Sequence, residues 1–233
     1  MGKKQKLKGN AAILNSLSII FSISMIVIVL LANFEMFAFS SSYYQKQFAS
    51  LGVYSEFEMR GISRQQVNLY SEKIILFLTG KGELPAGFFN SDEESHMMDV
   101  RHLFLAINYA FIAAIALSAA SIALLLGLFK RQGAGKAASC FSKAAISVTA
   151  LIAIAGALLI FQKNFEWIFI AFHNIFFPSG NWAFPEGSTI ITLFPEAFFR
   201  HIAVSIFLLS AAELAALAVL SFLYIKSPNF RKL

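Results

Sequence analysis

The stretch from Leu103 to Phe129 contains no charged residue. A helix needs about 20 mostly apolar residues to cross the hydrocarbon core of a membrane, so this stretch is long enough to span one. Three further apolar segments lie at about residues 11–34, 144–161 and 195–225. The composition agrees, since only 14% of the residues are charged, against about 25% in soluble domains. The sequence therefore predicts an all-α integral membrane protein with four transmembrane helices.

The first apolar segment follows a lysine-rich start, as the apolar part of a signal peptide would. It is longer than the roughly 7–15 residues of a typical signal peptide, and we therefore read it as an uncleaved anchor helix. The alternative is cleavage near residues 37–42. The chain length favours a single membrane domain covering residues 1–233. The one cysteine, Cys140, leaves no partner for an intramolecular disulfide.

The loops differ in charge, and this difference predicts their orientation. All but two of the 13 carboxylates lie in residues 40–101 and 162–200, whereas one set of basic residues has no acidic residue among it. This set comprises Lys3, Lys4, Lys6, Lys8, Lys130, Arg131, Lys136, Lys143, Lys226, Arg231 and Lys232. Basic loops stay in the cytoplasm. We therefore expect both termini to be cytoplasmic and the loops 40–101 and 162–194 to form an extracytoplasmic cap.

Short motifs in the loops predict local structure. The sequence "GAGK" at residues 133–136 lacks the Ser/Thr and the spacing of a phosphate-binding loop, and we read it as a flexible turn. Residues 63–78 carry apolar side chains at helical spacing, with Ser63 as the predicted N-cap and Gly80 as the predicted stop. The second outer loop is rich in phenylalanine and tryptophan and interrupted by prolines, which places it at the outer leaflet of the membrane.

The four histidines all lie on the predicted outer side: His96, His102, His173 and His201. His96 and Asp99 are three residues apart and share a face if the second span continues outward as a helix. A carboxylate at one imidazole nitrogen makes the other nitrogen a better base. His173 stands among apolar residues, and paired with His96 it could complete a base and proton shuttle near neutral pH. His102 is expected to point elsewhere.

Other chemistry has weaker support in the sequence. The chain contains neither a G-x-S-x-G nucleophile motif nor an H-E-x-x-H zinc motif. Metal binding by His96, Asp99, His173 and His201 is possible on residue type, but their spacing is only a weak signal for it. Glu213 lies near the middle of the fourth predicted span. It is either functional or a protonated group hydrogen-bonded between helices.

Several motifs together resemble the bacterial lipoprotein intramolecular transacylase family. They are "SHMMDV" at residues 95–100, "FHNIFF" at 172–177, "NWAF" at 181–184 and "LFPEAFF" at 193–199. The resemblance covers most of the chain and includes the predicted four-helix topology. One departure is that "WAFPEGSTII", at residues 182–191, has no aspartate where many members of the family carry one.

The resemblance implies an acyltransferase of the bacterial cytoplasmic membrane. The family moves the sn-2 acyl chain of a diacylglyceryl-modified cysteine onto the α-amine of the same lipoprotein, without a cofactor, metal or nucleic acid. Its two histidines correspond to His96 and His173 here. Four further residues are expected to support them: Asp99 by orienting His96, Asn174 by stabilising the oxyanion, and Glu93 and Trp182 as neighbours. The partners implied are the lipoprotein substrate and membrane lipid.

Two other functions stay open on the residues alone. One is a zinc-dependent membrane hydrolase that uses the same histidines as metal ligands. The other is a non-enzymatic anchor or transport component, although the predicted spans carry little polar lining beyond Glu213.

Overall fold

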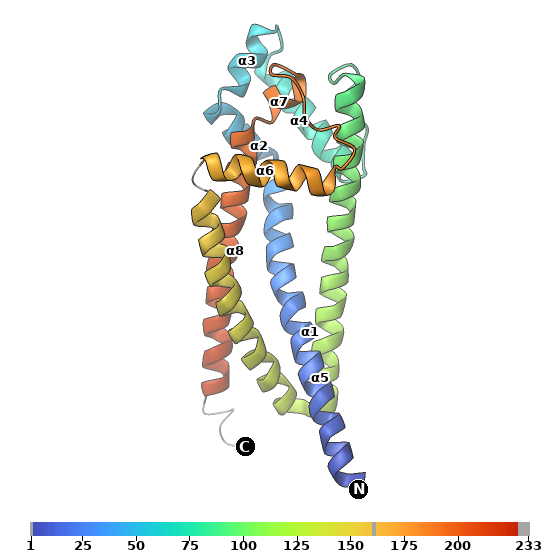
Figure 1. Ribbon diagram of the computed structural model, residues 1–233, viewed down its shortest axis with the longest axis vertical. Helices are drawn as coiled ribbons and strands as arrows, with labels where there is room; N and C mark the ends of the chain where they lie inside the picture. Colours follow the sequence, from blue (N-terminus) through green and yellow to red (C-terminus); the bar gives the residue numbers. More distant parts are fainter. Residues whose placement is uncertain (1, 160–161, 228–233) are drawn as a thin grey trace. The chain divides into compact units, whose positions relative to one another are not determined.

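The computed structural model in Figure 1 describes residues 2–159 and 162–227. All regular structure in this described part is α-helical, so the predicted all-α class is confirmed. In chain order the helices are α1 (Gly2–Ala38), α2 (Ser41–Ser50), α3 (Val53–Met59), α4 (Arg64–Leu78), α5 (Ser91–Leu159), α6 (Gln162–Phe176), α7 (Thr189–Leu193) and α8 (Glu196–Lys226).

Three helical segments in the described residues are long and apolar enough to cross a membrane. They are Gly9–Ala38 of α1, Ser91–Ala157 of α5 and Glu196–Lys226 of α8. Helix α5 contains the second predicted span and residues 144–159 of the third, and Lys130, which lies between them, has non-helical backbone angles (φ 50°, ψ −130°). The count of four spans stays a prediction, and residues 160–161 at the end of the third one lie outside the described part.

The predicted flexible turn at residues 133–136 is wrong, because these residues are helical. The chain changes direction at Lys130, and helix resumes at once. Gly133 is required by this bend: a Cβ atom there would collide with the carbonyl oxygen of Leu125. The glycine therefore permits a close approach of two helical segments, one of the uses of a residue without a side chain.

The described residues group into two compact units. The first is formed by the described parts of Met1–Asn33, Tyr109–Ala155 and Phe207–Leu233. Within it, α1, the two arms of α5 and α8 run alongside one another (Figure 1). Their apolar faces meet in a core that includes Phe141 and Leu214. This unit therefore consists of the long apolar helices alone.

A polar contact lies inside this first unit. The side-chain amide of Asn33 on α1 donates hydrogen bonds to the carboxylate of Glu213 at 2.6 Å and to the hydroxyl of Ser210 at 3.0 Å, both on α8. The acid in the fourth predicted span is thus hydrogen-bonded between two helices, one of the two roles that the sequence left open.

The second unit comprises Phe34–Asn108 and Gly156–Ile206, so it contains residues of both predicted outer loops. Its core is largely aromatic and includes the fully buried Phe48, Phe57 and Leu193. The short helices α2, α3, α4 and α7 and the first turns of α5 and α8 contribute to this core. That the two loops form a cap, and that residues 1–233 are one domain, stay predictions.

Helix α4 has the ends that the sequence predicts. The Ser63 hydroxyl accepts from the Gln66 backbone N–H, and the Gln66 side chain accepts from the Ser63 backbone N–H at 2.8 Å, which together form a capping box. At the other end, Gly80 has a φ of 77° and its N–H donates to the Phe77 carbonyl. This left-handed residue stops the helix after Leu78.

Candidate active site

His96 lies near the start of α5, and the way this helix begins fixes its position. The Asn90 side chain accepts hydrogen bonds from the backbone N–H groups of Asp92 and Glu93, both at 3.0 Å. Glu93 in turn accepts from the Asn90 backbone N–H at 2.9 Å. This reciprocal pair is a capping box in which asparagine replaces the usual serine or threonine. His96 therefore lies in the turn that follows this anchored helix start.

His173 lies in the last turn of α6 and has one ring nitrogen occupied. Its Nδ1 is 2.8 Å from the Phe169 carbonyl oxygen, and since a carbonyl can only accept, Nδ1 carries the hydrogen. In the neutral ring the lone pair is then at Nε2. The Phe169 and Trp182 rings lie 4.1 and 4.8 Å from the imidazole, centroid to centroid. The histidine is thus oriented by its own helix and held between aromatic rings.

The structure brings the two predicted histidines together within the second unit. The centroids of the His96 and His173 rings are 6.1 Å apart, and the ring planes differ by 28°. Phe177 packs against both rings, and Phe184 against His96. The residues are only 5% and 8% exposed, so two titratable groups share one apolar setting. Such a pair can pass a proton between bound groups while bulk water is excluded.

Burial changes the acidity of both rings. Removal from water, together with the nearby His173, lowers the pKa of His96 to about 4, against the opposite effects of Asp99 and Asn181. Burial also lowers the pKa of His173, against the effect of its bond to Phe169. Both imidazoles are therefore neutral at pH 7, the form that accepts a proton.

We expect the protein to lose stability as the pH falls from about 6.5 to about 4. The unfolded chain protonates His96 near 6.5, but the folded chain does so only near 4. Between these values the unfolded state binds more protons, so lowering the pH favours unfolding, by on the order of 1–3 kcal/mol. Thermal unfolding of the detergent-solubilised protein at several pH values measures the effect.

The variant His96→Gln should flatten this part of the stability curve, because glutamine does not titrate. His102→Gln is the matched control, since His102 lies on the same helix and is exposed. Equal acid sensitivity of wild type and His96→Gln would contradict the prediction.

Asn181, which the sequence analysis did not name as a candidate site residue, also lies at this site. Its side-chain amide donates to the Asp99 carboxylate at 2.7 Å. Asp99 lies one turn beyond His96 on α5 and acts on its charge. No direct hydrogen bond joins Asp99 to His96 in the described residues. That Asp99 orients His96 stays a prediction. The sequence signal that could have indicated Asn181 is a polar side chain within an aromatic loop.

The other predicted supporting residues have different surroundings. Glu93 is 1% exposed, and its second carboxylate oxygen accepts from the Ile190 backbone N–H at 3.0 Å. Trp182 packs against His173, as noted above. Asn174 follows His173 on α6 and is exposed, and no hydrogen bond of its side chain is found in the described part of the chain. Its role at the oxyanion stays a prediction.

The two remaining histidines, His102 and His201, have other surroundings. His102 is exposed, and Nδ1 of His201 bonds to the Gln47 side-chain oxygen at 2.7 Å. Among the described residues, no group of three or more His, Cys, Asp or Glu side chains is arranged to hold a metal ion. The described residues therefore contain no cluster of ligands of the kind that the zinc-hydrolase alternative requires.

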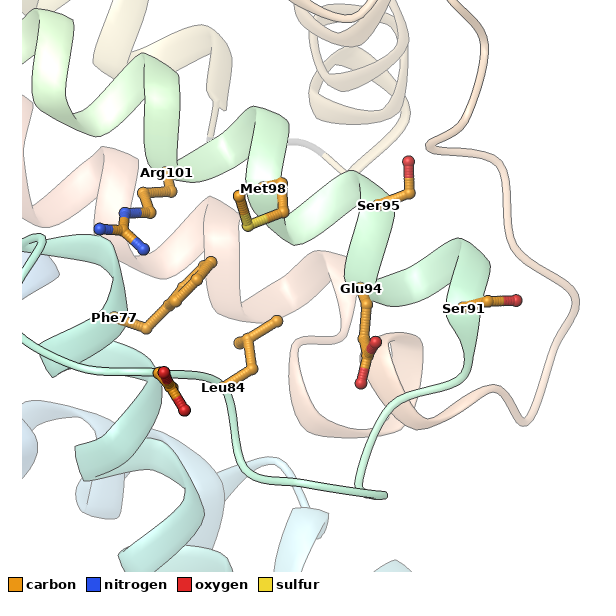
Figure 2. A pocket seen from close by; sticks show the side chains of 8 residues that line it. Phe77, Leu84, Ser91, Glu94, Ser95, Met98 and Arg101 are labelled. Atoms are coloured by element: carbon orange, nitrogen blue, oxygen red, sulfur yellow. The ribbon is translucent and has the colours of Figure 1, made fainter.

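A separate pocket of about 460 Å³ lies on another face of α5 (Figure 2). It is lined by Phe77, Glu83, Leu84, Ser91, Glu94, Ser95, Met98 and Arg101. The Arg101 guanidinium lies 4.8 Å from the centre of the Phe77 ring. Positions 94 and 98 are two residues from His96, which on a helix corresponds to the opposite side. This pocket is therefore not the histidine site.

Comparison with known proteins identifies relatives of this chain. The sequence profile of the family described as "Lipoprotein intramolecular transacylase Lit" matches residues 19–199. The fold resembles the structure of the membrane-integral transacylase Lit from Bacillus cereus, with a TM-score of 0.74 at 19% identity over 93% of this chain and 95% of that one. No curated protein matches the chain by sequence.

Two further structures of the Bacillus cereus protein, in which one histidine is replaced, are similar as well. The arginine variant has a TM-score of 0.70 over 96% of this chain and 95% of that one, and the alanine variant 0.72 over 95% and 97%, both at 19% identity. At this identity they show the fold, and the profile shows the family. The chain belongs to the lipoprotein intramolecular transacylase family and is an acyltransferase.

Proposed function

We propose that this protein moves the sn-2 acyl chain of a diacylglyceryl-modified lipoprotein onto the α-amine of its N-terminal cysteine. The product is a lipoprotein with an N-acyl group and one remaining ester. The observation that carries the proposal is the pair of buried imidazoles whose ring centroids lie 6.1 Å apart. Amide formation from an ester needs one group to take a proton from nitrogen and one to return a proton to oxygen.

The donor ester and the acceptor amine belong to one substrate molecule. Holding them in line removes much of the entropic barrier, and effective molarities for such reactions reach about 10⁵–10⁸ M. The aromatic rings around the histidines offer apolar walls for acyl chains and exclude water, which would otherwise hydrolyse the ester. The protein therefore has to supply orientation and proton transfer.

The proton balance of the reaction is simple. The neutral amine attacks the ester carbonyl, a carbon–nitrogen bond forms, and the nitrogen becomes acidic. Nε2 of His173 takes that proton, since Nδ1 is committed to the Phe169 carbonyl. As the carbon–oxygen bond at sn-2 breaks, the glyceryl oxygen gains a proton by way of His96, whose buried Nδ1 has no hydrogen-bond partner among the described residues. One proton thus moves from nitrogen to oxygen.

The same proposal includes the location of the reaction. We place the protein in the bacterial cytoplasmic membrane as a four-span protein, with both termini inside and the histidines on the outer face. The support is the basic residues clustered near the termini and around Lys130, since such loops stay in the cytoplasm. Lipoprotein substrates and membrane lipid would then meet the site from the same side.

The test is expression in a bacterium that lacks its own N-acylating enzyme. Because an intramolecular transfer adds and removes no atoms, the lipoprotein N-terminus keeps its mass, and the decisive readout is fragmentation. We expect an acyl group on the cysteine nitrogen and loss of amine labelling. A substrate with different chains at sn-1 and sn-2 shows which one moves. A mass increase by one acyl group, or an unchanged reactive amine, would refute the proposal.

A further inference from the structure

The pocket of about 460 Å³ on the other face of α5 carries both signs of charge (Figure 2). Its charged lining residues are Glu83, Glu94 and Arg101, all in the second unit. In the described part of the chain, none of these three side chains takes part in a hydrogen bond or an ion pair. Charged groups that are not paired with each other can bind a ligand without first breaking internal bonds.

Arg101 is held in place by an aromatic ring. Its guanidinium lies 4.8 Å from the centre of the Phe77 ring. Phe77 is only 3% exposed, so the hydrophobic core fixes the ring on which the arginine rests. The five N–H donors of a guanidinium lie in its plane, and contact with a ring face leaves them available. Arg101 therefore offers a supported site for an anionic group such as a phosphate.

The charges of the pocket are separated along α5. Glu94, Met98 and Arg101 are spaced four and three residues apart, so they lie on one face of the helix. The seven residues from Glu94 to Arg101 correspond to about 10 Å along the axis. Figure 2 shows Arg101 at one end and Glu94 toward the other, with Met98 between them and Phe77 and Leu84 facing α5. The pocket thus has a cationic end, an apolar middle and an acidic end.

The cationic end lies next to the apolar part of α5. Arg101 comes two residues before the charge-free stretch Leu103–Phe129, whereas Glu94 lies two turns further from it. One turn beyond Arg101, the same face continues with the half-buried Leu105. A ligand that matches this order has an apolar part, then an anion, then a cation. A phospholipid with an amino group in its head group has this order: acyl chains, phosphate and ammonium.

We propose that this pocket binds the head group of a phospholipid of the ethanolamine class. The phosphate accepts hydrogen bonds from Arg101, and the ammonium donates to the carboxylates of Glu94 and Glu83. An extended peptide with a basic side chain would match the two carboxylates, but it would make no use of an arginine beside the apolar stretch. The inference goes beyond the proposed acyl transfer and does not rest on it, because the bound lipid undergoes no reaction.

Native mass spectrometry of the full-length protein tests this proposal. The protein is released from nanodiscs that contain equal parts of phosphatidylethanolamine and phosphatidylglycerol. Both lipids carry a phosphate, but only phosphatidylethanolamine carries an ammonium. We expect the wild type to retain phosphatidylethanolamine over phosphatidylglycerol by about two- to fivefold, the range for a contact between partly exposed charges. Equal retention of the two lipids would overturn the proposal.

Substitutions at the two ends should have different effects. The double variant Glu83→Gln/Glu94→Gln should lose the preference and still retain phospholipid, because the phosphate site is intact. Arg101→Gln should lower retention of both lipids by about three- to tenfold, since hydrogen bonds to a charged group are lost. Glu94→Lys should reverse the preference, because a lysine repels the ammonium. An unfolded variant cannot produce such a reversal, and its absence in a folded Glu94→Lys protein would overturn the proposal.

Two control variants change similar charges outside the pocket lining. Asp92→Asn removes an exposed carboxylate from the same first turn of α5. Arg64→Gln removes an exposed arginine that lies 4.4 Å from the centre of the Tyr54 ring. We expect both to retain lipid as the wild type does, and losses equal to those of the pocket variants would overturn the proposal. Pocket variants that bind a lysine-containing peptide more weakly and retain both lipids unchanged would identify a peptide as the occupant and also overturn it.

Discussion

Replacing His173 or His96 with alanine is expected to lower the rate of acyl transfer by about 10²–10⁴-fold. This is the range that a positioned acid or base contributes. Without His173, the nitrogen of the tetrahedral intermediate keeps its proton and the intermediate returns to the ester. Without His96, the glyceryl oxygen has to leave as an alkoxide. The initial rate of amine loss from a synthetic diacylglyceryl lipopeptide in micelles measures both effects.

The double variant, with both His96 and His173 replaced by alanine, tests whether the two histidines act on the same proton or independently. If the two imidazoles handle the same proton, removing both should cost little more than removing one, because groups that act as a unit are strongly non-additive. A loss in the double variant equal to the product of the two single losses would contradict this. His102→Ala, which changes an exposed histidine on α5, serves as the control, and protein levels are compared in every case.

The local features of the fold could be predicted because they depend on short stretches of sequence. Apolar runs of sufficient length predicted the long helices, and Ser63 and Gly80 marked the two ends of α4, as the structure confirms. Each of these depends on neighbours within a few positions, where helical spacing and capping chemistry apply. The bend was misplaced because a glycine was read as flexible, whereas Gly133 permits the close approach of helical segments after Lys130.

The site could be predicted only in part, because its contacts join distant segments. Resemblance to a family indicated His96 and His173, and the structure places their rings together. Asn181 was missed because its partner, Asp99, is 82 positions away, and no local pattern marks such a contact. Glu93 was expected beside the histidines, but its bonds to backbone groups 3 and 97 positions away show what it does.

Replacing Glu93 with alanine is expected to destabilise the protein by about 3–5 kcal/mol. This carboxylate is 1% exposed and accepts from two backbone N–H groups, those of Asn90 and Ile190. Removing it leaves both donors without a partner, at a cost of about 1–3 kcal/mol each, and more where the lost acceptor is charged. It also removes a negative charge from the start of α5, where the helix dipole favours one.

Replacing Glu93 should also affect the histidine site. Ile190 lies in the first turn of α7. This helix follows the segment that carries Trp182 and Phe184, whose rings pack against the two histidines. With the link to α5 lost, we expect a lower midpoint of thermal unfolding, by about 2–4 °C for each kcal/mol, together with a reduced kcat. Glu93→Gln keeps one acceptor but places an NH₂ group against the second N–H, so its effect should be intermediate.

Asp92→Asn is the matched control for this substitution. Asp92 lies in the same first turn of α5 and is exposed, so the change removes an equal charge from the helix start without breaking a buried bond. The loss of the charge alone should cost no more than about 1 kcal/mol. If Glu93→Ala and Asp92→Asn lower the unfolding midpoint equally, the helix dipole accounts for the effect and the link to Ile190 contributes nothing. Both variants remove one negative charge from the start of α5. A larger fall of the unfolding midpoint in Glu93→Ala is therefore due to the loss of the buried side chain that accepts from the Asn90 and Ile190 amides.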